Sequence, residues 1–486
     1  MVEGSRGKRT DRPSLGRRFP PERLAQEIRD LLRSTSCEPG EWRIQGLAVG
    51  RIRSARGTEV TRFSIHTEWE DPKRAKGSEL SATWASLRIE AGHEGEESVV
   101  SRYYDHDFNT VKNQVYGPLY PLAEWVAFNW FHLLYGTSRT AERKQDLRFG
   151  AEGFALPKLR FVPEGESVRL AWFPYHHDAA RVDFLAHGES VVPRDRVELE
   201  LSNFLNRVVG RLEEKGIRNS PLQAEWKAIL ELEDEERIFC QAAAALGLEP
   251  FSMEEELEDQ ILKAASLVGP ELLEEFFPAA DTHGLIEKAE AIASAMKTIE
   301  IGRNENSSLE KLRLRLNGLE ASPLAWERGY ELAKCVRSQL NLEGAAVSEA
   351  LLREFVNPEE LGLLDAIPRI DGLVSRNCSA VGSAVSSVLL TRRPETAKFA
   401  LARILCESLR LAESRSTLVT KERTDRQKLS RAFAAEFLAP AEEIGRRLPG
   451  RVIYRDNVDE LAGEFEVSAL VIENQIKNHG LGWIED

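Results

Sequence analysis

Hydrophobic positions in the first part of the chain recur mostly with a period of two. Polar and apolar residues largely alternate there, which is typical of antiparallel strands with one solvated face. A largely apolar segment, Leu119–Tyr135, instead predicts a mostly buried helix, and Pro21–Arg33 predicts an amphipathic one. Strands are predicted at 42–49, 61–69, 81–90, 168–173 and 182–185. We therefore expect residues 20–196 to form one β-rich α+β domain.

Beyond residue 196 the apolar positions follow the period of amphipathic helices. In Val197–Lys215, for example, the apolar side chains fall mostly on one stripe. Helices are predicted at 197–215, 222–246, 254–268, 270–277 and 284–299. Residues 197–318 are thus expected to form a helical domain or linker, and residues 319–486 a mainly helical C-terminal domain. The pattern as a whole predicts an α+β protein with several domains.

The charge balance narrows the classes of partner. The chain carries 65 Lys and Arg residues against 79 Asp and Glu residues, a net charge of −14. Phosphate binding needs clustered cations, so this balance argues against a broad nucleic-acid surface. Residues 1–19 are the basic exception and are predicted to be a disordered arm, either without a partner or touching phosphate or protein. Its cations are Arg6, Lys8, Arg9, Arg12, Arg17 and Arg18.

Composition also bears on the cellular compartment. No apolar run of about 18 residues occurs, so no membrane span is expected. The N-terminus lacks the apolar region of a secretory signal. The five cysteines are scattered and form no Cys-x-x-Cys pair, which favours reduced thiols over disulfides or a cysteine zinc site. These features together favour a cytoplasmic protein.

Two segments of the C-terminal domain carry the most specific signal. Ser430–Pro440 reads Ser-Arg-Ala-Phe-Ala-Ala-Glu-Phe-Leu-Ala-Pro, and it resembles the Phe-Ala-Ala-Glu signature of the ImmA/IrrE-type metallopeptidase domain. In that family a helix with His-Glu-x-x-His precedes the signature, and Lys398–Glu407 stands in its place. Two His one helical turn apart bind Zn²⁺ from one face, and the Glu activates water. The resemblance implies a zincin-like fold over roughly residues 340–486 and a bacterial source.

The ligands implied by the resemblance are missing. Arg403 and Glu407 stand at the two His positions, and Ile404 stands at the catalytic Glu. The third, acidic ligand would fall among Gln427, Lys428 and Leu429. Among the nine His of the chain, His479 alone belongs to this domain. We therefore expect a degenerate motif without a zinc site and without another cofactor.

Helical spacing suggests what replaces the metal. Arg403 and Glu407 are four residues apart on one helix face, so a salt bridge between them is expected to occupy the pocket. Phe433 and Glu436 are the other pocket candidates, with Glu436 either a functional acid or a structural residue of the motif. The first hypothesis is accordingly a non-catalytic pseudopeptidase that binds a protein partner through the old cleft or the N-terminal domain. The resemblance implies a regulatory or defence-related setting.

Two alternatives remain open. The first is an active zinc peptidase that cleaves a repressor or an antitoxin-like protein with atypical ligands. These ligands would be Glu407, Glu436 and a His from the N-terminal domain, namely His106, His176 or His177. The second is a DNA-binding regulator. Residues 458–476 resemble the closing helix pair of the family and also a helix-turn-helix. The regulator would use residues 458–478, with Asn474, Gln475 and Lys477 as the reading residues, together with the basic arm 1–19. Residues 451–486 are rich in acids, which disfavours phosphate binding.

Overall fold

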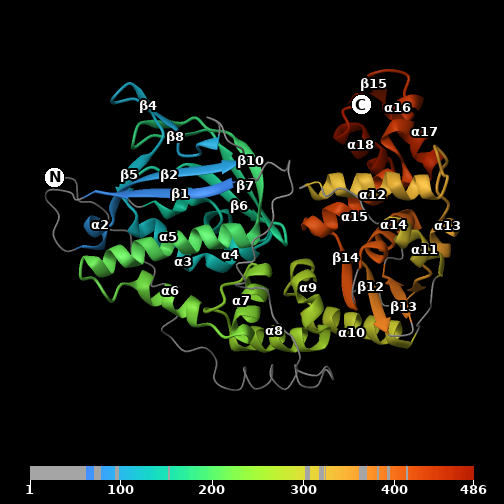
Figure 1. The fold of residues 1–486 in the computed structure, drawn as a ribbon, viewed down its shortest axis with the longest axis horizontal. Coiled ribbons are helices and arrows are strands. Elements are labelled where there is room, and N and C mark those ends of the chain that lie inside the picture. The colour runs from blue at the N-terminus through green and yellow to red at the C-terminus, as the bar shows by residue number, and fades with distance from the viewer. Residues whose placement is uncertain are drawn as a thin grey trace. The chain divides into compact units, whose positions relative to one another are not determined.

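The chain is an α+β protein with two compact units, Met1–Leu262 and Lys263–Asp486, in the computed structural model (Figure 1). The structure describes residues 62–70, 78–92, 98–151, 154–301, 307–316, 322, 324–360, 369–379, 382–390, 394–411 and 414–485. The predicted basic arm 1–19, helix 21–33 and strand 42–49 lie outside these residues. The boundary between the two units falls within α8 (Glu255–Val268).

Three antiparallel sheets form the framework of the N-terminal unit. Their strand orders are β1-β2-β5, β10-β7-β6 and β4-β3-β9-β8. The strands are β1 (Arg62–Trp69), β2 (Trp84–Gly92), β3 (Tyr103–Asp105), β4 (Thr110–Lys112), β5 (Val115–Pro118), β6 (Lys158–Pro163), β7 (Ser167–Phe173), β8 (Tyr175–His177), β9 (Val182–Phe184) and β10 (Gly188–Pro193). The strands predicted at 61–69, 81–90, 168–173 and 182–185 are thereby confirmed within a few residues, although 79–82 form the short helix α2.

Helices cover these sheets. The predicted helix at 119–135 is present as two helices that are interrupted at Asn129, whose side-chain amide donates to the carbonyl of Trp125 at 2.7 Å. The buried stripe of α5 packs against β1, β7 and β10, so this helix belongs to the N-terminal unit. The helices are α3 (Tyr120–Phe128), α4 (Trp130–Tyr135), α5 (Arg194–Glu214), α6 (Pro221–Glu231) and α7 (Asp234–Ala245), with 3-10 turns η2 (Glu142–Lys144) and η3 (Leu147–Gly150).

The C-terminal unit surrounds a four-stranded sheet of order β11-β13-β12-β14. Its strands are β11 (Glu359–Glu360), β12 (Ile370–Ser379), β13 (Gly382–Leu389) and β14 (Arg415–Thr420), and a separate parallel pair is formed by β15 (Val452–Tyr454) and β16 (Trp483–Glu485). The helices are η4 (Pro270–Leu272), α9 (Leu273–Ala279), α10 (Leu285–Ile301), α11 (Ser307–Arg315), α12 (Ala325–Gln339), α13 (Glu349–Phe355), α14 (Pro394–Arg410), α15 (Asp425–Leu438), α16 (Ala441–Arg447), α17 (Arg455–Phe465) and α18 (Ala469–Asn478).

This unit differs from the sequence expectation in two ways. The sheet was not foreseen in a domain expected to be mainly helical. The expected helical segment 197–318 is also divided, because α5 packs in the N-terminal unit and α9 and α10 pack against strands of the C-terminal sheet. Two acids explain part of this packing, since the backbone N–H of Ser416 donates to Glu271 at 3.0 Å and that of Leu418 to Glu275 at 2.6 Å. The open edge of β14 is therefore covered.

In the C-terminal unit, the helices α12 and α15 pack closely against each other. Gly329 of α12 lies so close to α15 that a Cβ atom there would be 2.4 Å from the carbonyl oxygen of Leu429 and 2.9 Å from the Cβ of Ala432. The absence of a side chain at this position lets the two backbones approach. This contact holds α15 in place beside α14, and the candidate site lies between those two helices.

Among the described residues, no helix has the length and apolar content that crossing a membrane would require.

Gly329→Ala should lower the free energy of unfolding by about 1–3 kcal/mol, because the added methyl group forces α12 and α15 apart. Gly463→Ala is the matched control, since a Cβ atom at this helical glycine would meet no atom within 4 Å. The control should be neutral or gain up to about 1 kcal/mol. Urea denaturation followed by far-UV circular dichroism measures both. Equal effects of the two substitutions would contradict the close approach.

Candidate functional site

The centre of the candidate site is the guanidinium group of Arg403 on α14. One nitrogen donates to the carboxylate of Asp371 at 2.9 Å, and another donates to the carbonyl of Thr420 at 2.6 Å and to the side-chain oxygen of Gln427 at 2.5 Å. The remaining nitrogen, Nε, donates to the hydroxyl of Ser430 at 3.3 Å. The acceptors come from β12, β14 and α15. One side chain thus connects two strands and two helices.

The backbone explains why these acceptors converge. Pairing between β12 and β14 is irregular between Ile370 and Gly372, so Asp371 lies at a β-bulge, where a strand commonly redirects a side chain. The amide of Gln427 is fixed by β14, since its oxygen also accepts from the N–H of Thr420 at 2.9 Å and its nitrogen donates to the carbonyl of Leu418 at 2.8 Å. The acceptor oxygen of Gln427 is therefore held in place independently of Arg403.

Arg403 is 2% exposed, so its positive charge is buried at the centre of this site. Burial lowers the pKa of the guanidinium, and the carboxylate of Asp371 opposes that effect. An ordinary arginine pKa is above about 12, so the group stays a cation at neutral pH. A buried charge is tolerated only with close partners of opposite charge and with its hydrogen bonds made. Asp371 and the three neutral acceptors meet this requirement.

The expected salt bridge between Arg403 and Glu407 is not formed, and the two side chains have different ion-pair partners. Among the described residues, no hydrogen bond reaches either carboxylate oxygen of Glu407. Glu407 is fully buried, and its carboxylate lies 3.1 Å from Nε of Arg426 and 3.6 Å from Arg410. Helical spacing allowed the predicted pair, but Asp371 and Gln427 offer Arg403 better-placed acceptors from other elements. Burial raises the pKa of Glu407, and Arg410 and Arg426 oppose this shift.

Two further positions of the predicted pocket belong to the hydrophobic core. Ile404, at the position that the resemblance gives to the water-activating Glu, is fully buried and packs against Gly372, where a Cβ atom would lie 2.9 Å from its Cδ1. Phe433 is also fully buried, and its ring stacks on that of Phe437 with centroids 5.3 Å apart. Neither side chain can therefore contact a substrate in this arrangement.

Glu436 belongs to a different buried network. Its carboxylate accepts from the amide of Gln475 at 2.8 Å and from the backbone N–H of Ala441 at 3.2 Å, and it lies 3.7 Å from Nε2 of His479. Burial lowers the pKa of His479, and Glu436 opposes this effect. The network joins α15 to α16 and α18, so the contacts of Glu436 are structural.

Gln475, one of the three residues predicted to read DNA, belongs to this same network. Gln475 is fully buried, and its amide also donates to the carbonyl of Ala439 at 2.9 Å, so it cannot reach a base edge. Asn474 and Lys477 are exposed. The turn between α17 and α18 is present as expected, with Glu466 in the left-handed region, and Lys398 of α14 donates to the carbonyl of Phe465 at 3.1 Å.

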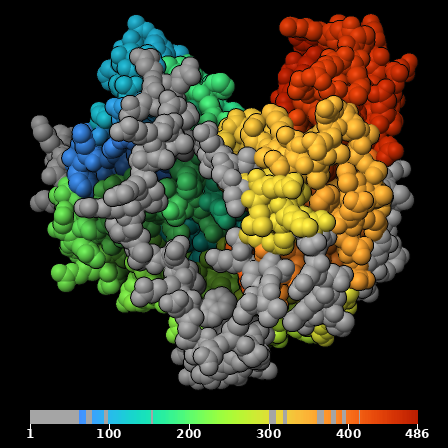
Figure 2. Space-filling view, turned by 45° about the vertical axis from the view of Figure 1, so that its right-hand side comes forward, coloured from blue at the N-terminus to red at the C-terminus, as the bar shows by residue number. Residues whose placement is uncertain are grey.

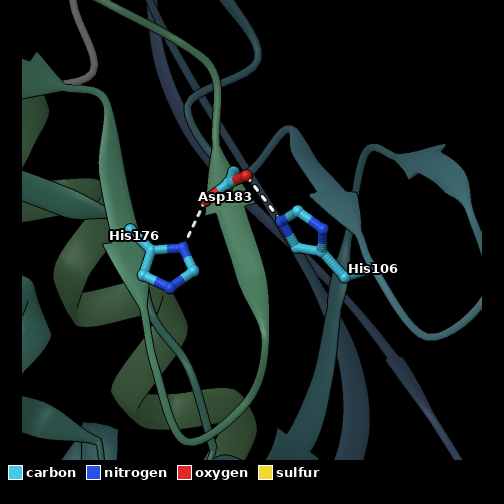
Figure 3. A group of neighbouring side chains, drawn as sticks. All are labelled: His106, His176 and Asp183. Atoms are coloured by element: carbon cyan, nitrogen blue, oxygen red, sulfur yellow. Dashed lines mark hydrogen bonds and ion pairs between the residues drawn. The ribbon is translucent and has the colours of Figure 1, made fainter.

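A second cluster lies in the N-terminal unit, where three side chains meet on the sheet β4-β3-β9-β8 (Figure 3). Nε2 of His106 lies 2.6 Å from one oxygen of Asp183, and Nδ1 of His176 lies 2.5 Å from the other. The pKa of Asp183 is lowered mainly by its hydrogen bond with His176 and further by its hydrogen bond with His106. The hydrogen bond between His176 and Asp183 also raises the pKa of His176. His177 stands apart, because its Nδ1 accepts from the N–H of Ala180 at 3.1 Å.

These positions bear on the atypical peptidase set. His106 and His176 are engaged with Asp183 in the N-terminal unit, whereas Glu407 and Glu436 belong to two different networks of the C-terminal unit. Neither unit by itself assembles the predicted combination of Glu407, Glu436 and a His. Around Arg403, the positions that match the family motif supply no imidazole ligand.

Searches of family models, of curated proteins and of solved structures found no match to this chain. The resemblance of 398–407 and 430–440 to the ImmA/IrrE-type domain therefore continues to rest on those residues.

Sequence reasoning missed two acids that organise the sites. Asp371 was not considered, although it interrupts the apolar run Ile370–Val374 beside a glycine, which is a signal for a bulge or a buried partner. Asp183 lies within the predicted strand 182–185, and its alternation with Val182 and Phe184 already placed it on the polar face. The identity of the strand beside it could not be read from the sequence.

Arg403→Met should lower the free energy of unfolding by about 3–5 kcal/mol, because it leaves the buried carboxylate of Asp371 without its closest cation. Asp371→Asn should also destabilise the protein. In the double variant the two effects should fall short of their sum by about 1–3 kcal/mol, the signature of a direct pair. Urea denaturation of the four proteins measures this coupling.

Arg446→Met is the matched control for that cycle. Its guanidinium is 61% exposed and pairs with Glu442 and Glu443 on the surface. Exposed pairs of this kind contribute about 0–1 kcal/mol. If Arg403→Met cost no more than Arg446→Met, the network around Arg403 would not be a central stabilising feature.

Glu407→Gln tests the raised pKa of that carboxyl through pH. A carboxyl whose pKa is higher in the folded state binds protons preferentially there, so wild-type stability decreases as pH rises from about 4.3, the ordinary value for Glu, to the raised pKa. The glutamine variant lacks this loss. Its stability relative to wild type should therefore increase with pH across that window, measured by urea denaturation between pH 4 and 8. Glu442→Gln, at a 77% exposed side chain, is the matched control; a decreasing difference for Glu407→Gln would contradict the burial effect.

Proposed function

We propose that this chain is a non-catalytic member of the ImmA/IrrE type that acts as a regulatory, protein-binding module. The observation that carries the proposal is the buried guanidinium of Arg403, which has four acceptors within hydrogen-bonding distance. In the family frame, Arg403 stands at the first zinc ligand, and Gln427 is one of the positions for the third. A fixed cation at this point would repel Zn²⁺.

The chemistry of peptide hydrolysis is also unsupported around this cation. Hydrolysis by a zinc peptidase needs a general base beside the metal-bound water. The residue in that position is Ile404, packed against Gly372 in the core. Glu407, at the second His position, pairs with Arg426 and Arg410 instead of facing an open cavity. These contacts support a loss of catalysis with retention of the two-helix framework.

Binding of a partner would then use a surface away from Arg403, since that side chain is buried. In the C-terminal unit, Val452, Tyr454 and Trp483 are exposed by 48%, 57% and 69% on the paired strands β15 and β16. Val452 and Trp483 are direct neighbours in the strand register. Exposed apolar groups that cluster in this way are typical of protein-interaction sites. The segment that carries them lies in the part of the chain drawn in red in Figure 2.

A groove beside these strands adds to the case. It has a volume of about 490 Å³, and its lining includes Ile476, Trp483 and the cationic side chains of Arg451 and Lys477. Apolar walls with two cations suit a protein segment that combines apolar and acidic side chains. We assign the partner-binding role to this surface, which we call the β15–β16 surface.

Photo-crosslinking tests the proposal. A benzoylphenylalanine at position 483 should capture a protein in the cells that produce the chain, whereas the same group at Leu314 should not. Leu314 is the matched control because it is also 69% exposed and lies in the same unit. The captured partner should be intact by mass spectrometry.

Three results would count against the proposal. Equal capture at positions 483 and 314, or no capture at 483, would remove the β15–β16 surface as the binding site. Cleavage of the captured partner by the purified chain, stopped by a chelator, would show that the chain is an active metallopeptidase.

A further inference from the structure

The polar cluster of the N-terminal unit arises from the strand register. In the sheet β4-β3-β9-β8, Asp183 of β9 lies opposite Tyr104 of β3 on one side and opposite His176 of β8 on the other. His106 follows two residues after Tyr104, and its N–H donates to the carbonyl of Arg181 at 3.2 Å, which extends the pairing. Alternation then places the side chains of His106, His176 and Asp183 on one face of the sheet.

We propose that His106, His176 and Asp183 form a binding site for one divalent transition-metal ion, with Zn²⁺ as the best-suited ion. Two imidazoles and one carboxylate are ligands that Zn²⁺ uses in proteins. The rings stand on either side of the carboxylate and turn a nitrogen toward it (Figure 3). The inference is independent of the proposed function, which concerns the other unit.

The distances suit an ion after small side-chain rotations. One ligand atom from each residue can be chosen so that all three lie within 4.8 Å of one another. Around a tetrahedral ion with bonds of about 2.0–2.2 Å, ligand atoms stand about 3.3–3.6 Å apart. Nε2 of His106 and Nδ1 of His176 now contact Asp183 more closely than that, so the ion would separate these pairs by roughly 1 Å while both rings keep their direction.

One of the two rings has a hydrogen-bonding partner outside the ligand set. Nε2 of His176 lies 3.2 Å from the exposed carboxylate of Asp178, which can accept a hydrogen bond from the Nε2–H group when Nδ1 binds the ion. Outer carboxylates of this kind favour one tautomer of a ligating His. The ring of Tyr104 stands edge-on to that of His106, with centroids 4.9 Å apart. His106 thus has an aromatic neighbour, and His176 has a polar one.

Hydrogen bonds to the carboxylate of Asp105 hold the turn that carries His106. Asp105 is buried, and its carboxylate accepts from the backbone N–H groups of Asp107 and Phe108 at 3.0 and 3.2 Å and from Lys112 at 2.8 Å. These bonds hold the turn between β3 and β4 and so limit the positions open to His106. A preorganised turn reduces the cost of ordering a ligand on binding.

The partial exposure of the three ligand side chains allows a bound ion to exchange with solvent. The side chains of His106, His176 and Asp183 are 38%, 53% and 36% exposed. Three protein ligands leave one tetrahedral position for water, as in zinc sites that bind or activate a small ligand. An ion can therefore enter and leave without unfolding of the sheet.

Titration of the full-length chain with Zn²⁺ by isothermal calorimetry, after removal of metal with a chelator, tests the proposal. We expect saturable binding of one equivalent. His106→Ala and His176→Ala should each weaken binding by at least about tenfold, and Asp178→Asn, at a 99% exposed side chain, should weaken it less than either. His177→Ala is the matched control, since it neighbours His176 but bonds to Ala180, and it should leave the affinity unchanged.

Two results would overturn the site. One is the absence of saturable Zn²⁺ binding by the wild-type chain. The other is binding that survives in the double variant His106→Ala/His176→Ala, or that His177→Ala weakens as much as His176→Ala does. Zinc that persists in the double variant would also place an ion elsewhere in the chain. Failure of this site alone would leave the proposal for the C-terminal unit intact, since that proposal depends on Arg403. Circular dichroism of each variant confirms that the fold is retained.

Discussion

A buried positive charge sets the main constraint on the C-terminal unit. The guanidinium of Arg403 must be matched inside the protein, because a charge removed from water without partners costs several kcal/mol. Asp371 of β12, Thr420 of β14, and Gln427 and Ser430 of α15 provide the match. None of these elements can shift without leaving a buried polar group unpaired. Three features position these partners around the guanidinium: the bulge at Asp371, the pairing of Gln427 with β14, and the close packing of α15 on α12.

The unit uses buried arginines in the same way elsewhere. Arg337 of α12 donates to the carbonyls of Phe437, Glu343 and Ala345, and so holds the end of α15 to the loop after α12. Arg403 differs in lying at a position that the resemblance to the ImmA/IrrE-type domain would give to a metal ligand. Its guanidinium has acceptors on several elements and connects them through hydrogen bonds.

The sequence predicted the local elements better than the contacts between them. Periodicity located β1, β7 and α5, because each carries its own pattern of buried positions. The helices α14 and α15 were expected instead from the resemblance of 398–407 and 430–440 to two motif helices of a known family. The sheet around β12 and β13 was missed, since its serines and glycines weaken the alternation. Local spacing also assigned Glu407 to Arg403, whereas acceptors distant in sequence displaced it. The same limit applies to Asp183: its strand was predicted, but its position beside His176 and His106 depends on the order β3-β9-β8, which no local pattern specifies.

The cluster around Arg403 and the cluster of His106, His176 and Asp183 differ in whether a ligand can enter and leave. Around Arg403 the guanidinium is buried and one of its acceptors, Gln427, is also bonded to the backbone, so replacing the cation by a metal would break several buried hydrogen bonds. At His106, His176 and Asp183 the groups are partly exposed, and water can satisfy each one during exchange. A reversible ligand needs the second situation, because its binding must not require the surrounding fold to open. The physical conditions for a stable framework and for a changeable site are thus met in different units of the chain. The residues that resemble a metallopeptidase motif thus take part in the packed framework of the C-terminal unit, whereas the neighbouring His106, His176 and Asp183 belong to the N-terminal unit.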